Sequence, residues 1–252
     1  GAGSFEALTS GLCTRAWELF QSFEAKGGMF AALRAGLPQT EISAAAEARR
    51  EAIAQRKLLL TGTSAFPLVS GAQVNVLAPA APEDPENALE NDRACLRPRR
   101  DAAPFEALRM AVDEYSWKTG ERPRIFLANL GSLPGDAAAS AFAANFFAIA
   151  GIDAVSGEAF EDIPAAADVF RASGCKIVCI CAPEGTVPQT LIEAWRALTL
   201  AGASRIYLTG GGRAEAVIAP PQLMVNEFNW TDRSALAILQ DATATVLGKQ
   251  LS

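Results

Sequence analysis

The chain has 252 residues, half of them hydrophobic and a fifth charged, a balance typical of one large or two small globular domains. Its net charge of −6 predicts no nucleic-acid partner and no acidic membrane surface, and no apolar stretch is long enough to cross a bilayer. The absence of histidine removes the commonest general base near neutral pH and the commonest metal ligand, which lowers the expectation of catalysis.

Residues 1–77 predict a helical unit. The start, GAGSFEAL, lacks the basic and apolar regions of a secretory signal. Apolar residues then recur every three or four positions from Ser4 to Lys26, with Ser4 as the expected N-cap. A short helix is expected over Met29–Ala35, and an alanine-rich helix begins near Pro38. These helices do not obviously form a core of their own.

Residues 78–104 carry five prolines and many charges, acidic in EDPENALEND and basic in RPRR. Such a segment buries too little apolar surface to form a core, so we expect an extended linker. It is either a solvated connector or an arm that lies on a partner. A helix with one apolar stripe is expected to follow, over Phe105–Lys118.

From Pro123 onward, apolar strands alternate with helices, and residues 105–252 therefore predict an α/β domain. Five strands are expected, at RIFLANL, DAVSG, KIVCICA, RIYLTG and LMVNEF. The first intervening helix carries Phe142, Phe146 and Phe147 on one stripe. This alternation predicts a five-stranded parallel sheet with helices on both faces, in the flavodoxin-like order 2-1-3-4-5.

The cysteines are odd in number and show no disulfide pattern, which favours a reducing, cytoplasmic compartment. Cys175, Cys179 and Cys181 alternate along the third expected strand, so their side chains should share one face as small buried thiols. Without histidine or a C-x-x-C spacing, no metal site is expected there.

Ligands of open parallel sheets bind beyond the carboxyl ends of the strands, which here carry NLGSLPGD, CAPEGTVP and TGGGR. Asp136 and Glu184 could form an acid/base pair, or two loop carboxylates that cap helix N-termini. Thr209–Arg213 could form a phosphate nest to which Arg213 adds charge, or a loop that needs positive φ or close backbone approach.

The N-terminal motifs resemble the segment that closes the barrel domain of methylmalonyl-CoA mutases. That family has a glycine-serine step, a VExLT helix start, an AW pair and an E-x-x-GGM turn. The matching residues are Gly3-Ser4, Glu6 to Thr9, Ala16-Trp17, and Glu24 with Gly27 to Met29. Phe5 replaces the usual valine. Residues Leu60–Pro67 resemble the exit from the barrel, and the half from Arg124 resembles the cobalamin-binding domain.

The family's cobalamin domain carries D-x-H-x-x-G after the first strand, and its histidine is the lower ligand of cobalt. An S-x-L follows the third strand and a GG the fourth. Alignment places Leu133, Gly135 and Ala138 at the Asp, His and Gly positions, and Cys181 and Pro183 at the Ser and Leu positions. Gly210-Gly211 alone agree with the motifs.

The resemblance therefore implies the non-catalytic small subunit of a heterodimeric mutase. Such a chain has no catalytic, cofactor-binding or metal-ligating residues of its own, and adenosylcobalamin belongs to the partner, a large catalytic subunit. The complex would interconvert methylmalonyl-CoA and succinyl-CoA. The alternatives are a domain that binds cobalamin without a histidine ligand, and one that has reused the cleft for a nucleotide.

Overall fold

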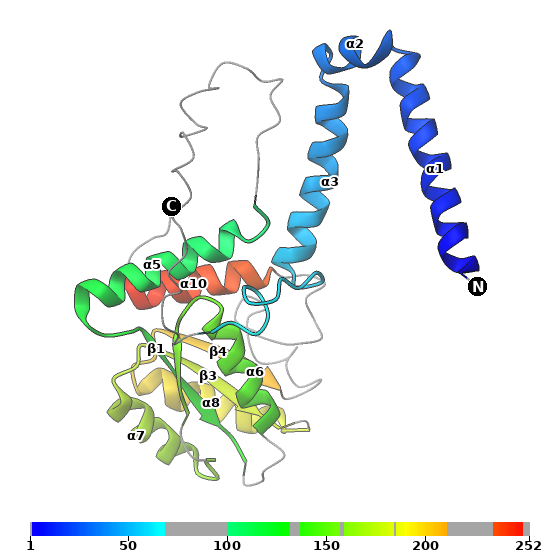
Figure 1. Ribbon diagram of the computed structural model, residues 1–252. Coiled ribbons are helices and arrows are strands. Elements are labelled where there is room, and N and C mark those ends of the chain that lie inside the picture. Colours follow the sequence, from blue (N-terminus) through cyan, green and yellow to red (C-terminus); the bar gives the residue numbers. More distant parts are fainter. Residues whose placement is uncertain are drawn as a thin grey trace. The chain divides into compact units, whose positions relative to one another are not determined.

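The computed structural model describes residues 2–68, 100–131, 137–156, 159–183, 185–210 and 234–248 (Figure 1). These residues belong to two compact units. The first contains residues 2–49, and the second contains residues 50–68 together with the described residues from Arg100 onward. The predicted division into residues 1–77, 78–104 and 105–252 stays a prediction, because most of its linker lies outside the described residues.

The first unit is helical, as predicted. It comprises α1 (Gly3–Glu24), α2 (Gly28–Arg34) and most of α3 (Leu37–Ala54). The predicted N-cap Ser4 is wrong: the helix begins at Gly3, Ala2 is the capping residue, and no side chain caps it. Gly27 has a φ of 97°, a left-handed conformation that suits glycine and ends the helical run before α2.

Helix α1 buries none of its residues within the chain. Its apolar stripe faces outward, with Leu8 and Leu12 about 60% exposed and Trp17 59% exposed. Trp17 stacks on Phe20 of the same helix, with ring centroids 5.3 Å apart. A face of this kind is typical of a surface that another protein segment covers.

The second unit is built on a parallel sheet in the order β2-β1-β3-β4. The strands are β1 (Arg124–Asn129), β2 (Asp153–Ser156), β3 (Ile177–Ala182) and β4 (Arg205–Gly210). The parallel pairing and the order of these strands confirm the prediction. Within the described residues the sheet has four strands, and the fifth expected strand, LMVNEF, lies outside them.

Helices cover both faces of this sheet, as predicted. One face packs against α5 (Ala103–Thr119), α6 (Ala137–Ala148) and α10 (Ala235–Leu247), and Figure 1 shows α5 and α10 side by side. The other face packs against α7 (Ile163–Ser173) and α8 (Pro188–Leu200). The strands are buried on both sides, which explains why they read as continuous apolar runs.

The predicted stripe of α6 is at the centre of the larger core. Phe146 and Phe147 are fully buried and meet edge to face, with centroids 5.2 Å apart. Phe147 also lies 5.2 Å from the ring of Tyr207 on β4. Ile53, at the end of α3, joins the same core, and so the last turn of that helix belongs to the second unit.

One polar cluster joins α10 to β4. The Tyr207 hydroxyl donates to Asp241 Oδ2 at 2.8 Å, and the Arg205 guanidinium donates to both Asp241 oxygens at 2.9–3.1 Å. Burial, and secondly the nearby Asp241 carboxylate, raise the pKa of Tyr207 far above its usual range, so this phenol stays neutral in the folded chain. None of the described helices is long and apolar enough to span a membrane.

Candidate functional site

The carboxyl edge of the sheet is where the sequence places a ligand site, and strand register determines what meets there. Asn129 on β1 is in register with Cys181 on β3, and Cys181 with Thr209 on β4. Ala182 pairs with Gly210 one position further on. An amide, a thiol and a hydroxyl therefore lie in a row across three neighbouring strands.

The chain that leaves β1 is tied to its neighbours by hydrogen bonds. The Asn129 amide nitrogen donates to Ser156 Oγ at 3.1 Å, across β1 and β2. The Leu130 N–H donates to the Cys181 carbonyl at 2.9 Å, and the Gly131 N–H donates to the Phe160 carbonyl at 3.1 Å. Sequence reasoning missed Asn129 and Ser156. Each of them is the polar residue that ends an apolar strand, and this pattern in the sequence could have identified them.

The two thiols of β3 are structural, as predicted. Cys179 is completely buried and Cys181 is 1% exposed, both within the core shared with α5, α6 and α10. Burial, and to a smaller extent Cys181, raises the pKa of Cys179 well above the usual value for a thiol. Because the thiolate is the nucleophilic form, this burial makes Cys179 unreactive.

The prediction that Cys175, Cys179 and Cys181 share one face of the strand is wrong for Cys175. Strand β3 begins only at Ile177, after a left-handed Gly174 that ends α7. Cys175 therefore precedes the regular alternation of the strand. It is half-buried and packs against the opposite core, the one that contains α7 and α8.

Several candidate positions cannot be placed. Leu133, Gly135, Asp136, Glu184, Gly211 and Arg213 lie outside the described residues, so the acid/base pair and the phosphate nest stay predictions. Ala138 is exposed in the first turn of α6. The Pro183 carbonyl accepts hydrogen bonds from the N–H and the hydroxyl of Thr186, at 3.2 and 2.8 Å, which close the loop after β3 into a turn.

Gly210 has a local structural reason to be glycine. Its φ is +79°, and a Cβ added there would overlap the carbonyl oxygen of Ala182 on the paired strand. The same Cβ would lie 3.4 Å from the Ala139 side chain of α6. Of the two interpretations of TGGGR, close backbone approach is therefore confirmed at Gly210, and contact with a ligand is not needed to explain this residue.

No set of three His, Cys, Asp or Glu side chains within the described parts of the chain could hold a metal ion. The polar groups of this edge that the structure places are neutral, and two of them, on Asn129 and Ser156, already bind each other. The arrangement orders the strand ends, and among the described residues of this edge no charged acid or base lies beside the thiol and the hydroxyls.

Comparison with known proteins supplies the family. The sequence profile of the family described as "Methylmalonyl-CoA mutase" matches residues 1–116. A protein named methylmalonyl-CoA mutase small subunit, from Streptomyces virginiae, is 37% identical over 213 residues, which cover 84% of this chain and 33% of that protein. The chain belongs to the methylmalonyl-CoA mutase family.

Further proteins with methylmalonyl-CoA mutase names also match this chain. The probable small subunit from Mycobacterium bovis is 32% identical over 91% of this chain and 35% of its own length, and the small subunit from Porphyromonas gingivalis is 30% identical over 86% and 33%. A protein named simply methylmalonyl-CoA mutase, from Cereibacter sphaeroides, is 32% identical over 45% of this chain. The chain spans about a third of the length of the small subunits it matches.

Proposed function

We propose that this chain is part of the small subunit of a heterodimeric, adenosylcobalamin-dependent methylmalonyl-CoA mutase, and that it supports the large catalytic subunit without taking part in the reaction. The observation that carries the proposal is the carboxyl edge of the sheet. The family resemblance predicts a cobalamin site there, and the residues placed there are structural. The relatives that match most of the chain are named small subunits.

The parallel order β2-β1-β3-β4 fits a flavodoxin-like sheet, which is the architecture that the proposed descent from a cobalamin-binding domain requires. On this proposal the fifth strand, expected at LMVNEF, completes the sheet next to β4.

The residues present do not fit cobalamin held through a histidine. The chain contains no histidine at all, and the aligned position is Gly135, which has no side chain. Cys181, at the position of the motif serine, points its thiol into the core, where it is 1% exposed. Gly210 agrees with the motif but is explained by the Ala182 carbonyl. We therefore place adenosylcobalamin in the partner large subunit, where it supplies the radical chemistry of the isomerisation.

On this proposal the chain contributes to the complex through a surface that binds another part of the assembly. Helix α1 exposes a stripe of large apolar side chains, and a stripe of that kind is typical of a surface that another protein segment covers. On this proposal the complex interconverts methylmalonyl-CoA and succinyl-CoA. The buried, unpaired thiols Cys179 and Cys181 fit a reducing compartment, so we place the complex in the cytoplasm.

Co-expression of the complete small subunit that contains this chain with the large subunit of the same organism tests the proposal. We expect the two subunits to co-purify in equal amounts, with mutase activity. After the subunits are separated, the absorbance of cobalamin should stay with the large one. Activity should survive Asn129→Ala and Ser156→Ala. Cobalamin that stays with the small subunit, or loss of turnover in either variant at normal complex yield, would contradict it.

A further inference from the structure

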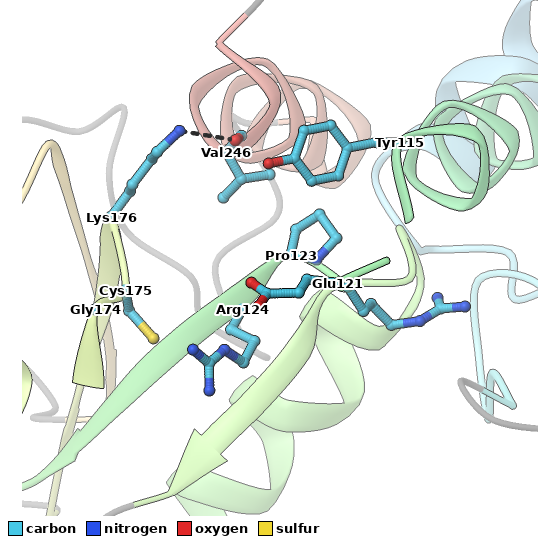
Figure 2. A pocket seen from close by; sticks show the side chains of 9 residues that line it. Tyr115, Glu121, Pro123, Arg124, Gly174, Cys175, Lys176 and Val246 are labelled. Carbon is cyan, nitrogen blue, oxygen red and sulfur yellow. Dashed lines mark hydrogen bonds between the residues drawn. The ribbon is translucent and has the colours of Figure 1, made fainter. Parts of the chain in front are cut away.

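The two units differ in how far they bury their own apolar residues. The second unit contains two cores, one on each face of its sheet. Even the pocket of about 110 Å³ at the amino-terminal edge of that sheet is bridged, by a hydrogen bond from the Lys176 ammonium to the Val246 carbonyl at 3.3 Å (Figure 2). In the first unit, by contrast, α1 buries no residue and α2 buries only Ala32.

The apolar face of α1 is large. It consists of six side chains that are between 46% and 74% exposed: Phe5, Leu8, Leu12, Trp17, Leu19 and Phe20. Because a large apolar side chain presents roughly 200 Å² when fully exposed, these six expose roughly 700 Å². The largest apolar patch of a typical monomer is roughly 300–600 Å². Since each partner of a standard interface contributes roughly 800 Å², the face amounts to most of one side of a stable interface.

The face is wide as well as large. At about 100° per residue, Leu8 and Trp17 lie about 180° apart around α1, and the other four side chains lie between them. A helix that pairs with a single partner helix has a narrow apolar seam, whereas a helix on a globular core has a stripe wider than about 100°. The face therefore fits the surface of a globular domain better than it fits the α1 of a second copy.

The described residues of this chain leave the face exposed. The predicted linker, residues 78–104, carries five prolines and many charges, so its composition offers little apolar surface to bury against α1. The family profile covers residues 1–116 and stops inside α5, before β1 begins, which groups the helical unit apart from the sheet. The chain spans only 33–35% of the small subunits that it matches, and the remaining length of such a subunit is enough for a further domain.

We propose that the apolar face of α1 is bound by the part of the small subunit's own chain that lies outside these 252 residues, as one side of a core within that subunit. The part of the assembly that covers α1 is then the small subunit itself. A segment of the same chain is present at a roughly millimolar effective concentration, so the face is covered before any other subunit binds. The proposal rests on the proposed function in one respect, since it takes this chain to be part of a small subunit.

Cys13 reports whether the face is covered. Its thiol is exposed, and at about 100° per residue it lies between Phe20 and Trp17 around α1. The test is the rate at which iodoacetamide alkylates Cys13, followed by peptide-mapped mass spectrometry in this chain, in the complete small subunit and in its complex with the large subunit. We expect alkylation to be at least about tenfold slower in the complete small subunit than in this chain, because it must wait for local opening. The large subunit should not slow it further.

Each alternative occupant of the face gives a different pattern of rates. Protection of Cys13 that appears only in the complex would mean that the large subunit covers α1. Protection that falls when the complete small subunit is diluted would mean that a second copy does. Either pattern, or equal rates in this chain and in the complete small subunit, would overturn the proposal. Failure of the two subunits to co-purify would instead refute the proposed function, and it would leave the first two rates unchanged.

A pair of variants tests whether the covered face is the apolar one. Leu8→Gln removes a side chain from the face, and Ala7→Gln is the matched control, because Ala7 is exposed on the opposite, polar side of the helix. In the complete small subunit Leu8→Gln should speed the alkylation of Cys13, and Ala7→Gln should leave it unchanged. In this chain neither variant should matter, since Cys13 is already exposed.

Equal effects of Leu8→Gln and Ala7→Gln in the complete small subunit would overturn the proposal, since protection would then not depend on the apolar face. Urea unfolding midpoints establish whether each variant is folded. If Leu8→Gln prevents the complete small subunit from folding, the comparison of the unsubstituted chain with the unsubstituted subunit still decides between the outcomes.

Discussion

Replacing Gly210 by alanine tests whether this residue serves the packing of the sheet. A Cβ at position 210 would overlap the Ala182 carbonyl oxygen and lie 3.0 Å from its carbon. Two penalties add together. A left-handed φ of +79° costs an alanine about 1–2 kcal/mol, and forcing the strands apart costs about 1–3 kcal/mol more. We therefore expect Gly210→Ala to lower the free energy of unfolding by about 2–5 kcal/mol.

Gly120→Ala is the matched control. Gly120 ends α5 with a φ of +77°, nearly the same φ as Gly210, but no atom lies within 4 Å of a Cβ built there. It should lose only the backbone penalty of about 1–2 kcal/mol. Urea unfolding followed by far-UV circular dichroism compares the two variants. If Gly210→Ala is no less stable than Gly120→Ala, packing does not explain the glycine, and a ligand contact becomes the better explanation.

The core and its polar cluster give three further predictions. Phe146→Ala should lower the free energy of unfolding by about 3–5 kcal/mol, because the side chain is fully buried; a loss below about 1 kcal/mol in urea unfolding would refute its central position. Because the pKa of Tyr207 is raised on folding, its stabilisation is present below about pH 10 and declines above that by about 1.4 kcal/mol per pH unit. Tyr207→Phe should reduce this alkaline slope in urea midpoints taken from about pH 9 to 11, and an unchanged slope would show that other groups cause it. Asn129→Ala should cost about 0.5–1.5 kcal/mol through the lost bond to Ser156, and a loss above about 3 kcal/mol would mean that Asn129 does more than join the two strands.

The secondary structure of the α/β half was largely predictable, because its strands are covered on both faces and so appear as unbroken apolar runs. The segment RIYLTG coincides with β4, and RIFLANL exceeds β1 by one residue. The ends of elements were less predictable. Ser4 is a favourable capping residue, yet α1 begins one residue before it. The pattern of cysteines also did not reveal that β3 starts after Cys175.

The sequence predicted where in the fold the candidate site lies, but it did not predict which residues contact one another there. Parallel topology alone puts the ends of β1, β3 and β4 at one edge. The hydrogen bond between Asn129 and Ser156 joins residues 27 positions apart, and it depends on strand register that no local pattern encodes. The same holds for the approach of Ala182 to Gly210, which depends on the pairing of β3 with β4.

Isothermal titration of the purified chain with hydroxocobalamin tests the central claim most directly. That claim is that this member of the mutase family keeps the sheet of a cobalamin domain without its ligating chemistry. The account predicts no saturable binding in the micromolar range, because the chain has no histidine to donate to cobalt. Binding at micromolar affinity or tighter would contradict it, since about 8 kcal/mol would then have arisen without the ligand taken to be essential.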